Sequence, residues 1–150
     1  MKKKRGVAED SLKNLVFVLI AILAVSSCEK KNTGVPAATA EAKILGADSF
    51  RVTVNVPERH HAYLDRGKDG NLIPVQFDWT GFAPQPAPRS SPAGEYDDTV
   101  RAQVLRGSGN FDFQADTASL RKKTFSMKIQ ICDEVKGLCY RPNDISVEIL

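Results

Sequence analysis

Short runs of alternating apolar and polar residues constrain this chain more than any other feature. In residues 50–56 every second side chain is apolar, and Pro57 ends the run. A period of two gives an extended strand one apolar face and one polar face. The same pattern recurs in residues 125–131 and 145–149. The sequence therefore predicts β-strands that each bury one face.

Weaker strand signals lie between these runs. Residues 72–79 are apolar enough for a strand, but Pro74 lacks a backbone donor, which favours an edge or a strand start. Residues 100–113 hold two apolar runs around a Gly-Ser-Gly sequence, and this arrangement predicts a tight hairpin. Residues 81–94 contain four prolines, so we expect a long loop there.

The distribution of these signals predicts the fold class. No stretch after Cys28 shows a helical apolar period over ten residues, whereas seven or eight short strands are indicated. We therefore expect an all-β fold, an immunoglobulin-like antiparallel β-sandwich formed by residues 43–150. A small barrel is the alternative, because nothing in the sequence fixes whether the sheet closes.

The first 28 residues have the layout of an export signal. A basic cluster at residues 2–5 precedes eleven apolar residues at 15–25. As a helix this run covers about 16 Å, roughly half of a ~30 Å hydrocarbon core, so it is too short to span a membrane. The closing Val-Ser-Ser-Cys sequence resembles the lipobox of bacterial lipoproteins. That resemblance implies a signal peptide at 1–27 and a lipid on Cys28, whereas an ordinary secretory signal would leave Cys28 incidental.

The charge balance changes once this segment is considered separately. The chain has 21 Lys and Arg against 18 Asp and Glu, a net charge of +3. Residues 1–27 hold five Lys and Arg and two Asp and Glu, so residues 28–150 carry 16 charges of each sign. The positive excess thus belongs to the targeting segment and gives no reason to expect nucleic-acid binding. Residues 28–42 are small and polar, so we expect a flexible tether from a membrane to the domain.

Two cysteines remain once Cys28 is assigned to lipid. Cys132 follows one predicted strand and Cys139 precedes another, so the pair is expected to face across a hairpin that turns at Lys136-Gly137. Opposed Cα atoms in antiparallel strands lie about 4.5 to 5.5 Å apart, within the range of about 4.4 to 6.8 Å for disulfides. Most exported disulfides are structural. Closing so short a loop, however, stabilises a protein by only about 2 to 3 kcal/mol, so a redox role stays open.

The segment 132–142 resembles a known cysteine hairpin. It has a glycine before the second cysteine and a tyrosine and a proline after it, like the amino-terminal periplasmic domain of the thiol:disulfide interchange reductase (DsbD) family. Residues 56–64 are similar to an early strand of that family with an aromatic-x-Tyr pattern beside the active site. Tyr63 matches the tyrosine, and His61 stands where an aromatic residue often occurs. The resemblance covers most of residues 44–150.

This resemblance implies a function. The reduced cysteines would attack the disulfide of an exported thioredoxin-like partner; Cys139 would form the mixed disulfide and Cys132 would resolve it. No cofactor is implied. The chain holds neither the membrane electron-transfer domain nor the terminal thioredoxin domain of the family, so we expect a separate membrane electron-transfer protein as its reductant. The expected place of action is the periplasmic side of a bacterial membrane or the cell surface.

The resemblance also suggests neighbours for the cysteines. Tyr63 could pack on the disulfide or simply fill the core, and the motif match favours the first. Segment 94–98 would form a cap whose Tyr96 ring shields the sulfur atoms, although Tyr96 could equally be an ordinary loop residue. His61 and Tyr140 would be the other residues around the active-site cysteines.

Two rival interpretations stay open. The first is a non-catalytic immunoglobulin-like binding lipoprotein with a structural disulfide. The second is a zinc or copper site formed by the cysteines with His60 or His61, since thiolate and imidazole suit both metals. Adjacent residues of a strand point to opposite faces, so at most one of these histidines can join the cysteines.

Overall fold

The alternating runs form the long strands of this computed structural model, which describes Gly34 and residues 36–150. The predicted signal peptide, Cys28 and the first part of the tether lie outside the described residues. The elements in chain order are β1 (Thr39–Ile44), β2 (Ser49–Asn55), β3 (His60–Tyr63), β4 (Gln76–Asp78), β5 (Ala87–Ser90), β6 (Glu95–Asp97), β7 (Ala102–Leu105), β8 (Ser108–Gln114), the 3₁₀ helix η1 (Thr117–Ser119), β9 (Thr124–Ile129), β10 (Ile131–Asp133), β11 (Leu138–Cys139) and β12 (Asn143–Glu148).

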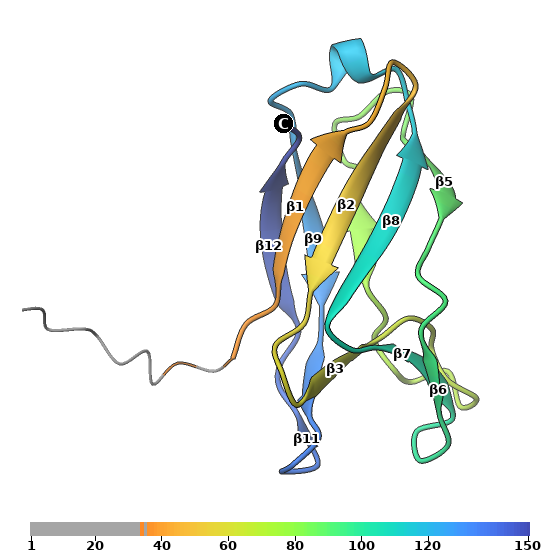
Figure 1. Ribbon diagram of the computed structural model, residues 1–150, viewed down its shortest axis with the longest axis vertical. Helices are drawn as coiled ribbons and strands as arrows, with labels where there is room; N and C mark the ends of the chain where they lie inside the picture. Colours follow the sequence, from red (N-terminus) through yellow and green to blue (C-terminus); the bar gives the residue numbers. More distant parts are fainter. Residues whose placement is uncertain (1–33, 35) are drawn as a thin grey trace, which may run out of the picture. The chain divides into compact units, whose positions relative to one another are not determined.

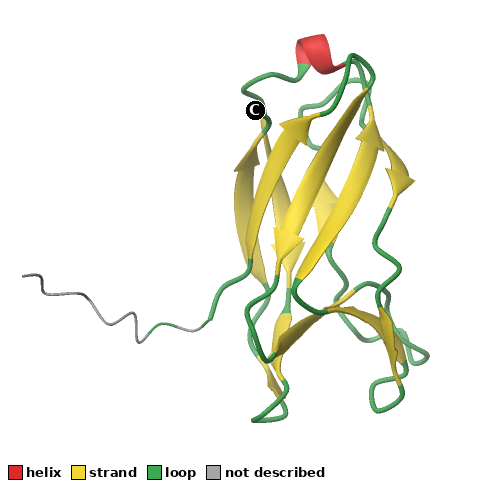
Figure 2. Ribbon diagram, viewed as in Figure 1, coloured by secondary structure: helices red, strands yellow, loops and turns green. Residues whose placement is uncertain are grey.

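The strands form antiparallel sheets in two layers (Figures 1 and 2). One layer has the order β1-β2-β8-β5, and it faces a sheet of order β12-β9-β4. A third sheet, β11-β10-β3-β7-β6, continues from the second, because only Gln130 separates β9 from β10. The predicted fold class is confirmed: this is an all-β antiparallel sandwich of immunoglobulin-like type.

The apolar faces of the alternating runs form the core. Phe50, Val52 and Val54 are fully buried on one face of β2, and Met127 of β9 is fully buried in the same cluster. The Phe50 ring stacks on Phe113 with centroids 5.4 Å apart and meets Trp79 edge to face at 5.8 Å. Such aromatic pairs add to the free energy gained by burial itself.

The predicted hairpin in residues 100–113 is wrong. β7 pairs with β3 and β6, whereas β8 pairs with β2 and β5, so the chain passes from one sheet to another. Glycine permits this crossing for steric reasons, since a Cβ on Gly109 would lie 2.6 Å from Leu105 Cδ1. β8 is paired with β2 along seven residues, and that long ladder determines its partner.

The predicted loop at 81–94 contains an element that the prolines concealed. Ala87–Ser90 form β5, which pairs with the edge of β8 and has a register shift between Pro88 and Ser90. All four residues of β5 are exposed. A proline is tolerated here because an edge strand leaves one row of backbone donors unpaired.

The predicted tether also ends earlier than expected. β1 begins at Thr39, and Ala42 is only 2% exposed opposite Val52. Alanines give almost no apolar periodicity, but their backbone completes the edge of the four-stranded sheet. Nowhere in residues 36–150 does the structure contain a helix with the length and hydrophobicity needed to cross a membrane.

Phe50 provides a test of this core. We expect Phe50→Ala to lower the free energy of unfolding by about 3 to 5 kcal/mol, since the ring is fully buried among other rings. Urea unfolding followed by the fluorescence of Trp79 measures this loss. Val135→Ala is the control, because this side chain is 65% exposed and its loss should change stability by less than about 0.5 kcal/mol. Equal effects of the two substitutions would contradict the described packing.

Candidate functional site

The two cysteines lie opposite each other in the hairpin formed by β10 and β11. Cys132 pairs with Cys139 in register and the two form a disulfide, as predicted from their spacing. Their Cα atoms are 3.9 Å apart, closer than the sequence led us to expect. The backbone N–H of Tyr140 donates to the Ile131 carbonyl on one side of the pair (3.0 Å). The disulfide therefore lies inside a regular antiparallel ladder.

Asp133 organises the turn that brings the cysteines together. Its Oδ1 accepts hydrogen bonds from the backbone N–H groups of Val135 and Lys136, both at 2.9 Å. Its Oδ2 accepts from the Tyr140 hydroxyl (3.3 Å) and lies 3.4 Å from Lys136 Nζ. The backbone N–H of Lys136 is the largest cause that lowers the Asp133 pKa to about 2. The ionised carboxylate is thus part of the folded turn.

The two sulfur atoms differ sharply in access. Cys132 is 3% exposed and packs in a small apolar cluster with Tyr63, Ala102 and Val104, separate from the main core. Cys139 is exposed, because β11 is the outer strand of its sheet. An incoming sulfur atom therefore reaches Cys139 from solvent and does not reach Cys132.

The hydroxyl of Tyr63 lies beside both sulfur atoms. It is 3.4 Å from Cys132 Sγ and 3.5 Å from Cys139 Sγ. The sulfur atoms of a disulfide carry no hydrogen, so the hydroxyl is the donor in both contacts. Burial, together with the negative charge of Asp97, raises the Tyr63 pKa, which keeps this proton in place. Tyr63 thus packs on the disulfide, in the position that the resemblance implied.

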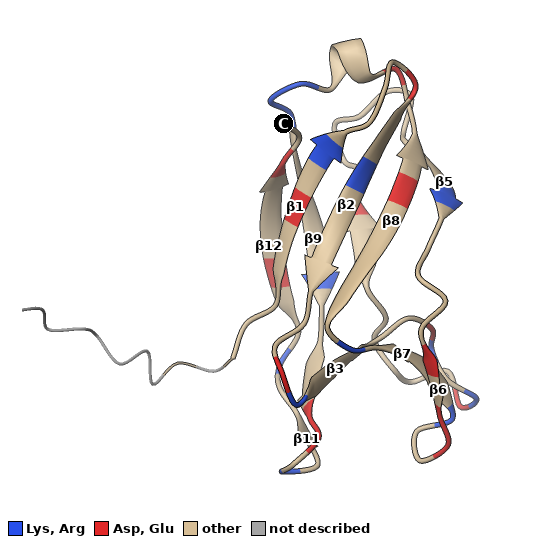
Figure 3. Cartoon of the chain, viewed as in Figure 1, with Lys and Arg blue, Asp and Glu red and all other residues tan. Residues whose placement is uncertain are grey.

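A hollow of about 430 Å³ opens in front of the disulfide. One wall belongs to the cysteine hairpin and the other to the segment around β6, which Figure 3 colours red for acidic residues. The residues that line it are His61, Tyr63, Asp97, Thr99, Val100, Arg106, Cys132, Asp133, Glu134, Gly137, Leu138 and Cys139.

Arg106 joins the two walls of this pocket. Its Nε donates to Glu134 of the hairpin (2.6 Å), and its two terminal nitrogens donate to Glu95 (2.8 Å) and Asp97 (2.9 Å) of β6. The bond to Glu134 is the main cause that raises the Arg106 pKa, and the same bond lowers the pKa of Glu134. Burial alone would raise the Asp97 pKa, but Arg106 and backbone donors lower it overall. Arg106, Glu134 and Asp97 therefore remain charged together.

The neighbouring histidines point to opposite faces of β3. His61 lies in the pocket, with Nδ1 3.2 Å from Glu134 Oε1 and its ring edge-on to the Tyr63 ring at 5.2 Å. The His60 Nδ1–H donates to the Glu58 carbonyl (2.8 Å), and its ring stacks on Tyr140 at 6.0 Å. The strand alternation thus selects His61 alone as a neighbour of the cysteines.

The structure brings together four of the six predicted site residues: His61, Tyr63, Cys132 and Cys139. Tyr140 lies behind the hairpin with His60 and does not line the pocket. The placement of Tyr96 needs correction. Its side chain is 58% exposed and absent from the pocket lining, because both of its strand neighbours turn their carboxylates to Arg106 and the alternation turns Tyr96 away.

Sequence reasoning missed Arg106 and Asp97. Arg106 follows β7 directly and belongs to no motif, and Asp97 stood in the expected cap as an unremarked neighbour of Tyr96. Only the pairing of β6 with β7, and of β3 with both β7 and β10, brings these residues beside the cysteines. No pattern within a short stretch of the sequence therefore identifies the network of Arg106 and Asp97.

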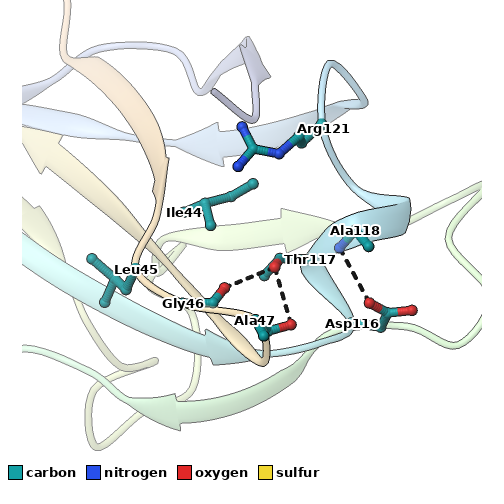
Figure 4. A pocket seen from close by; sticks show the side chains of 8 residues that line it. All are labelled: Ile44, Leu45, Gly46, Ala47, Asp116, Thr117, Ala118 and Arg121. Carbon is teal, nitrogen blue, oxygen red and sulfur yellow. Dashed lines mark hydrogen bonds between the residues drawn. The ribbon is translucent and has the colours of Figure 1, made fainter.

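The rest of the described structure offers fewer reactive groups than this pocket. Within residues 36–150, no group of three or more His, Cys, Asp or Glu side chains is arranged to hold a metal ion. A hollow of about 360 Å³ lies beside η1 and the turn after β1 (Figure 4). There Thr117 donates to the carbonyl of Gly46 (2.7 Å) and also contacts that of Ala47 (3.0 Å). These hydrogen bonds connect η1 to the turn after β1, so we assign this hollow a structural role.

A weak likeness to this chain is found among solved structures. No family model matches the chain, and no curated protein matches it. Among solved structures, the crystal structure of the Neisseria meningitidis DsbD n-terminal domain in the reduced form is 18% identical, with a TM-score of 0.46 over 83% of this chain and 88% of that chain. Nothing about the chemistry of the site follows from a likeness at this level.

Asp133 gives the hairpin a dependence on pH. Its pKa is lowered to about 2 in the folded chain, so its carboxylate contributes stability above the unfolded value of about 3.9. This contribution should be lost as the pH falls from about 4 towards about 2. We expect Asp133→Asn to be less stable than the native chain at pH 7 and to lose less on acidification, as measured by thermal unfolding at each pH. Asp144→Asn, at an exposed position of β12, is the control, and an unchanged acid profile in Asp133→Asn would contradict this role.

Proposed function

We propose that this domain exchanges thiols and disulfides with other proteins through Cys132 and Cys139. The observation that carries the proposal is the asymmetry of the pair: Cys139 is exposed at the edge of a pocket, and Cys132, which is bonded to it, is buried. Exchange needs an accessible sulfur to attack and a second one held within reach of the mixed disulfide. The hairpin register supplies both.

The reaction proceeds in two steps from the reduced pair. The Cys139 thiolate attacks a partner disulfide, one partner sulfur leaves as a thiolate, and a Cys139–partner disulfide forms. The Cys132 thiolate then attacks Cys139 Sγ and displaces the second partner sulfur. Two electrons pass to the partner, and the Cys132–Cys139 disulfide present in this structure is the product.

Tyr63 is suited to support both steps. Its hydroxyl is within hydrogen-bond distance of both sulfur atoms and, because its pKa is raised, it remains a donor. A hydrogen bond to a charged acceptor is roughly twice as strong as one between neutral groups. The hydroxyl therefore favours whichever sulfur carries negative charge at the time.

The cellular setting is part of the proposal and follows from the sequence. We propose that a lipid on Cys28 anchors the domain outside the cytoplasm, where disulfides persist. The partners would be exported thioredoxin-like proteins, and a separate membrane electron-transfer protein would return electrons to the pair. These assignments rest on the resemblance of residues 1–28, 56–64 and 132–142 to known patterns.

The reduction potential separates this function from a structural staple. We expect the Cys132–Cys139 pair to have a potential above about −300 mV, because a shuttling disulfide must be reduced and reoxidised in turn. Equilibration in thiol buffers of known potential, followed by alkylation and gel shift, measures it. A pair that stays oxidised below this potential would instead support a binding module, in which replacing both cysteines by serine leaves function intact.

Partner capture tests the assigned roles of the two sulfur atoms. In a Cys28→Ser background, Cys132→Ser should accumulate a mixed disulfide with a thioredoxin-like protein, because the resolving sulfur is gone. Non-reducing gels and mass spectrometry detect the adduct. Cys139→Ser is the matched control and should trap at least about tenfold less, since its remaining sulfur is only 3% exposed. Equal trapping by both variants would contradict the assignment.

A further inference from the structure

His61 is a buried base that the mechanism above leaves unused. It is 8% exposed, and its Nδ1 lies 3.2 Å from the Glu134 carboxylate. The Glu134 pKa is lowered, so this carboxylate is ionised and only accepts, which places a hydrogen on Nδ1. The remaining nitrogen, Nε2, is buried and has no hydrogen-bond partner in the described structure. An unpaired acceptor of this kind is costly to bury.

Cys132 is the cross-strand neighbour of His61. The two residues are directly paired between β10 and β3, and both line the same pocket. Directly opposed side chains in antiparallel strands have Cβ atoms about 4.5 to 5.5 Å apart. In the disulfide Cys132 Sγ carries no hydrogen, so it cannot donate to Nε2 in this oxidised state.

The second step of exchange creates a need for a base at this place. Cys132 must lose its thiol proton before it can attack, yet it is 3% exposed. With so little exposure, the Cys132 thiol has almost no solvent beside it to take its proton. The acceptor must therefore come from the pocket wall.

The other titratable groups that face His61 are poor acceptors. Those on the elements packed around it are Tyr63 of β3, Cys132 and Asp133 of β10, Glu134 of the turn, Arg106 after β7 and Asp97 of β6. The carboxyl groups of Asp97, Asp133 and Glu134 all have lowered pKa values. Tyr63 and Arg106 have raised pKa values and hold their protons. The imidazole is the one remaining base among the residues that line this pocket.

We propose that His61 is the proton acceptor for Cys132 in the resolving step, oriented by Glu134 and Arg106; this deepens and rests on the proposed exchange function. The thiol proton passes from Cys132 Sγ to His61 Nε2, and the S–H electron pair stays on sulfur. That pair forms the bond to Cys139 Sγ as the Cys139–partner bond breaks. The departing partner sulfur takes the electron pair of the broken bond and then a proton from the imidazolium. Glu134 holds Nδ1–H throughout and compensates the transient positive charge.

A model disulfide tests this step without any protein partner. The reduced full chain, with Cys28→Ser so that two thiols remain, is mixed with dithiobis(nitrobenzoate). The first release of thionitrobenzoate reports attack by Cys139, and the second reports resolution by Cys132. We expect His61→Phe to slow the second release at least about tenfold near pH 7 and to change the first by less than about twofold. From about pH 5 to about pH 9, the second rate should depend on two ionisations in the native chain and on one in the variant.

Matched variants keep the test interpretable. His60→Phe changes the adjacent residue, which is equally buried but lies on the opposite face, and should leave both releases as in the native chain. Glu134→Gln should slow the second release in the same direction as His61→Phe, since it removes the negative charge beside Nδ1. If His61→Phe does not fold, His61→Gln replaces it, with disulfide content and thermal unfolding as the check. A native second rate and pH profile in a folded His61 variant would overturn the proposal.

The outcome is separable from that of the proposed function. Absence of exchange with thioredoxin-like proteins, together with a slowed second release in His61→Phe, would leave His61 as the acceptor and reject only the partner class. Normal exchange with thioredoxin-like proteins, together with an unchanged second release in His61→Phe, would reject His61 as the acceptor and leave the proposed function in place.

Discussion

The ladder between β3 and β10 is the constraint on which the site depends. It sets His61 opposite Cys132 and His60 opposite Asp133, so the sulfur chemistry and the turn chemistry lie on opposite faces of one sheet. A slip of one residue would exchange these faces completely. The register is held because Ile131 pairs with fully buried Ala62 in the same ladder and is itself only 3% exposed. Core burial thus fixes the geometry of the sulfur atoms.

Charge determines how the pocket wall behaves. A single guanidinium, that of Arg106, bonds three carboxylates from two elements, and the side chain is only about one-third exposed. Removing one partner from such a network leaves the others unpaired, so its members are coupled energetically. The lowered pKa of Glu134 and the raised pKa of Arg106 are two results of the same contact. Arg106, Glu134 and Asp97 therefore stay ionised while a proton moves beside them.

The sequence predicted the parts of this structure that depend on local pattern. Alternation identified β2, β9 and β12, and the cysteine spacing identified the paired hairpin. It failed where pairing over long distances decided the outcome. The Gly-Ser-Gly turn looked like a hairpin, but the ladder of β8 with β2 took precedence. Tyr96 looked like a cap, but the contacts of its neighbours with Arg106, eleven and nine residues away, set its direction.

The location of the disulfide argues against stabilisation as its main purpose. A staple is most effective where it links distant segments, yet this bond joins residues only seven positions apart and gains about 2 to 3 kcal/mol at most. It lies outside the main core, in a small cluster with Tyr63. The Asp133 turn and the backbone ladder already hold the hairpin closed. The arrangement instead provides an exposed Cys139 and a buried Cys132, with the Tyr63 hydroxyl beside both sulfur atoms. His61 is the cross-strand neighbour of Cys132, and the proposed exchange requires groups of these kinds.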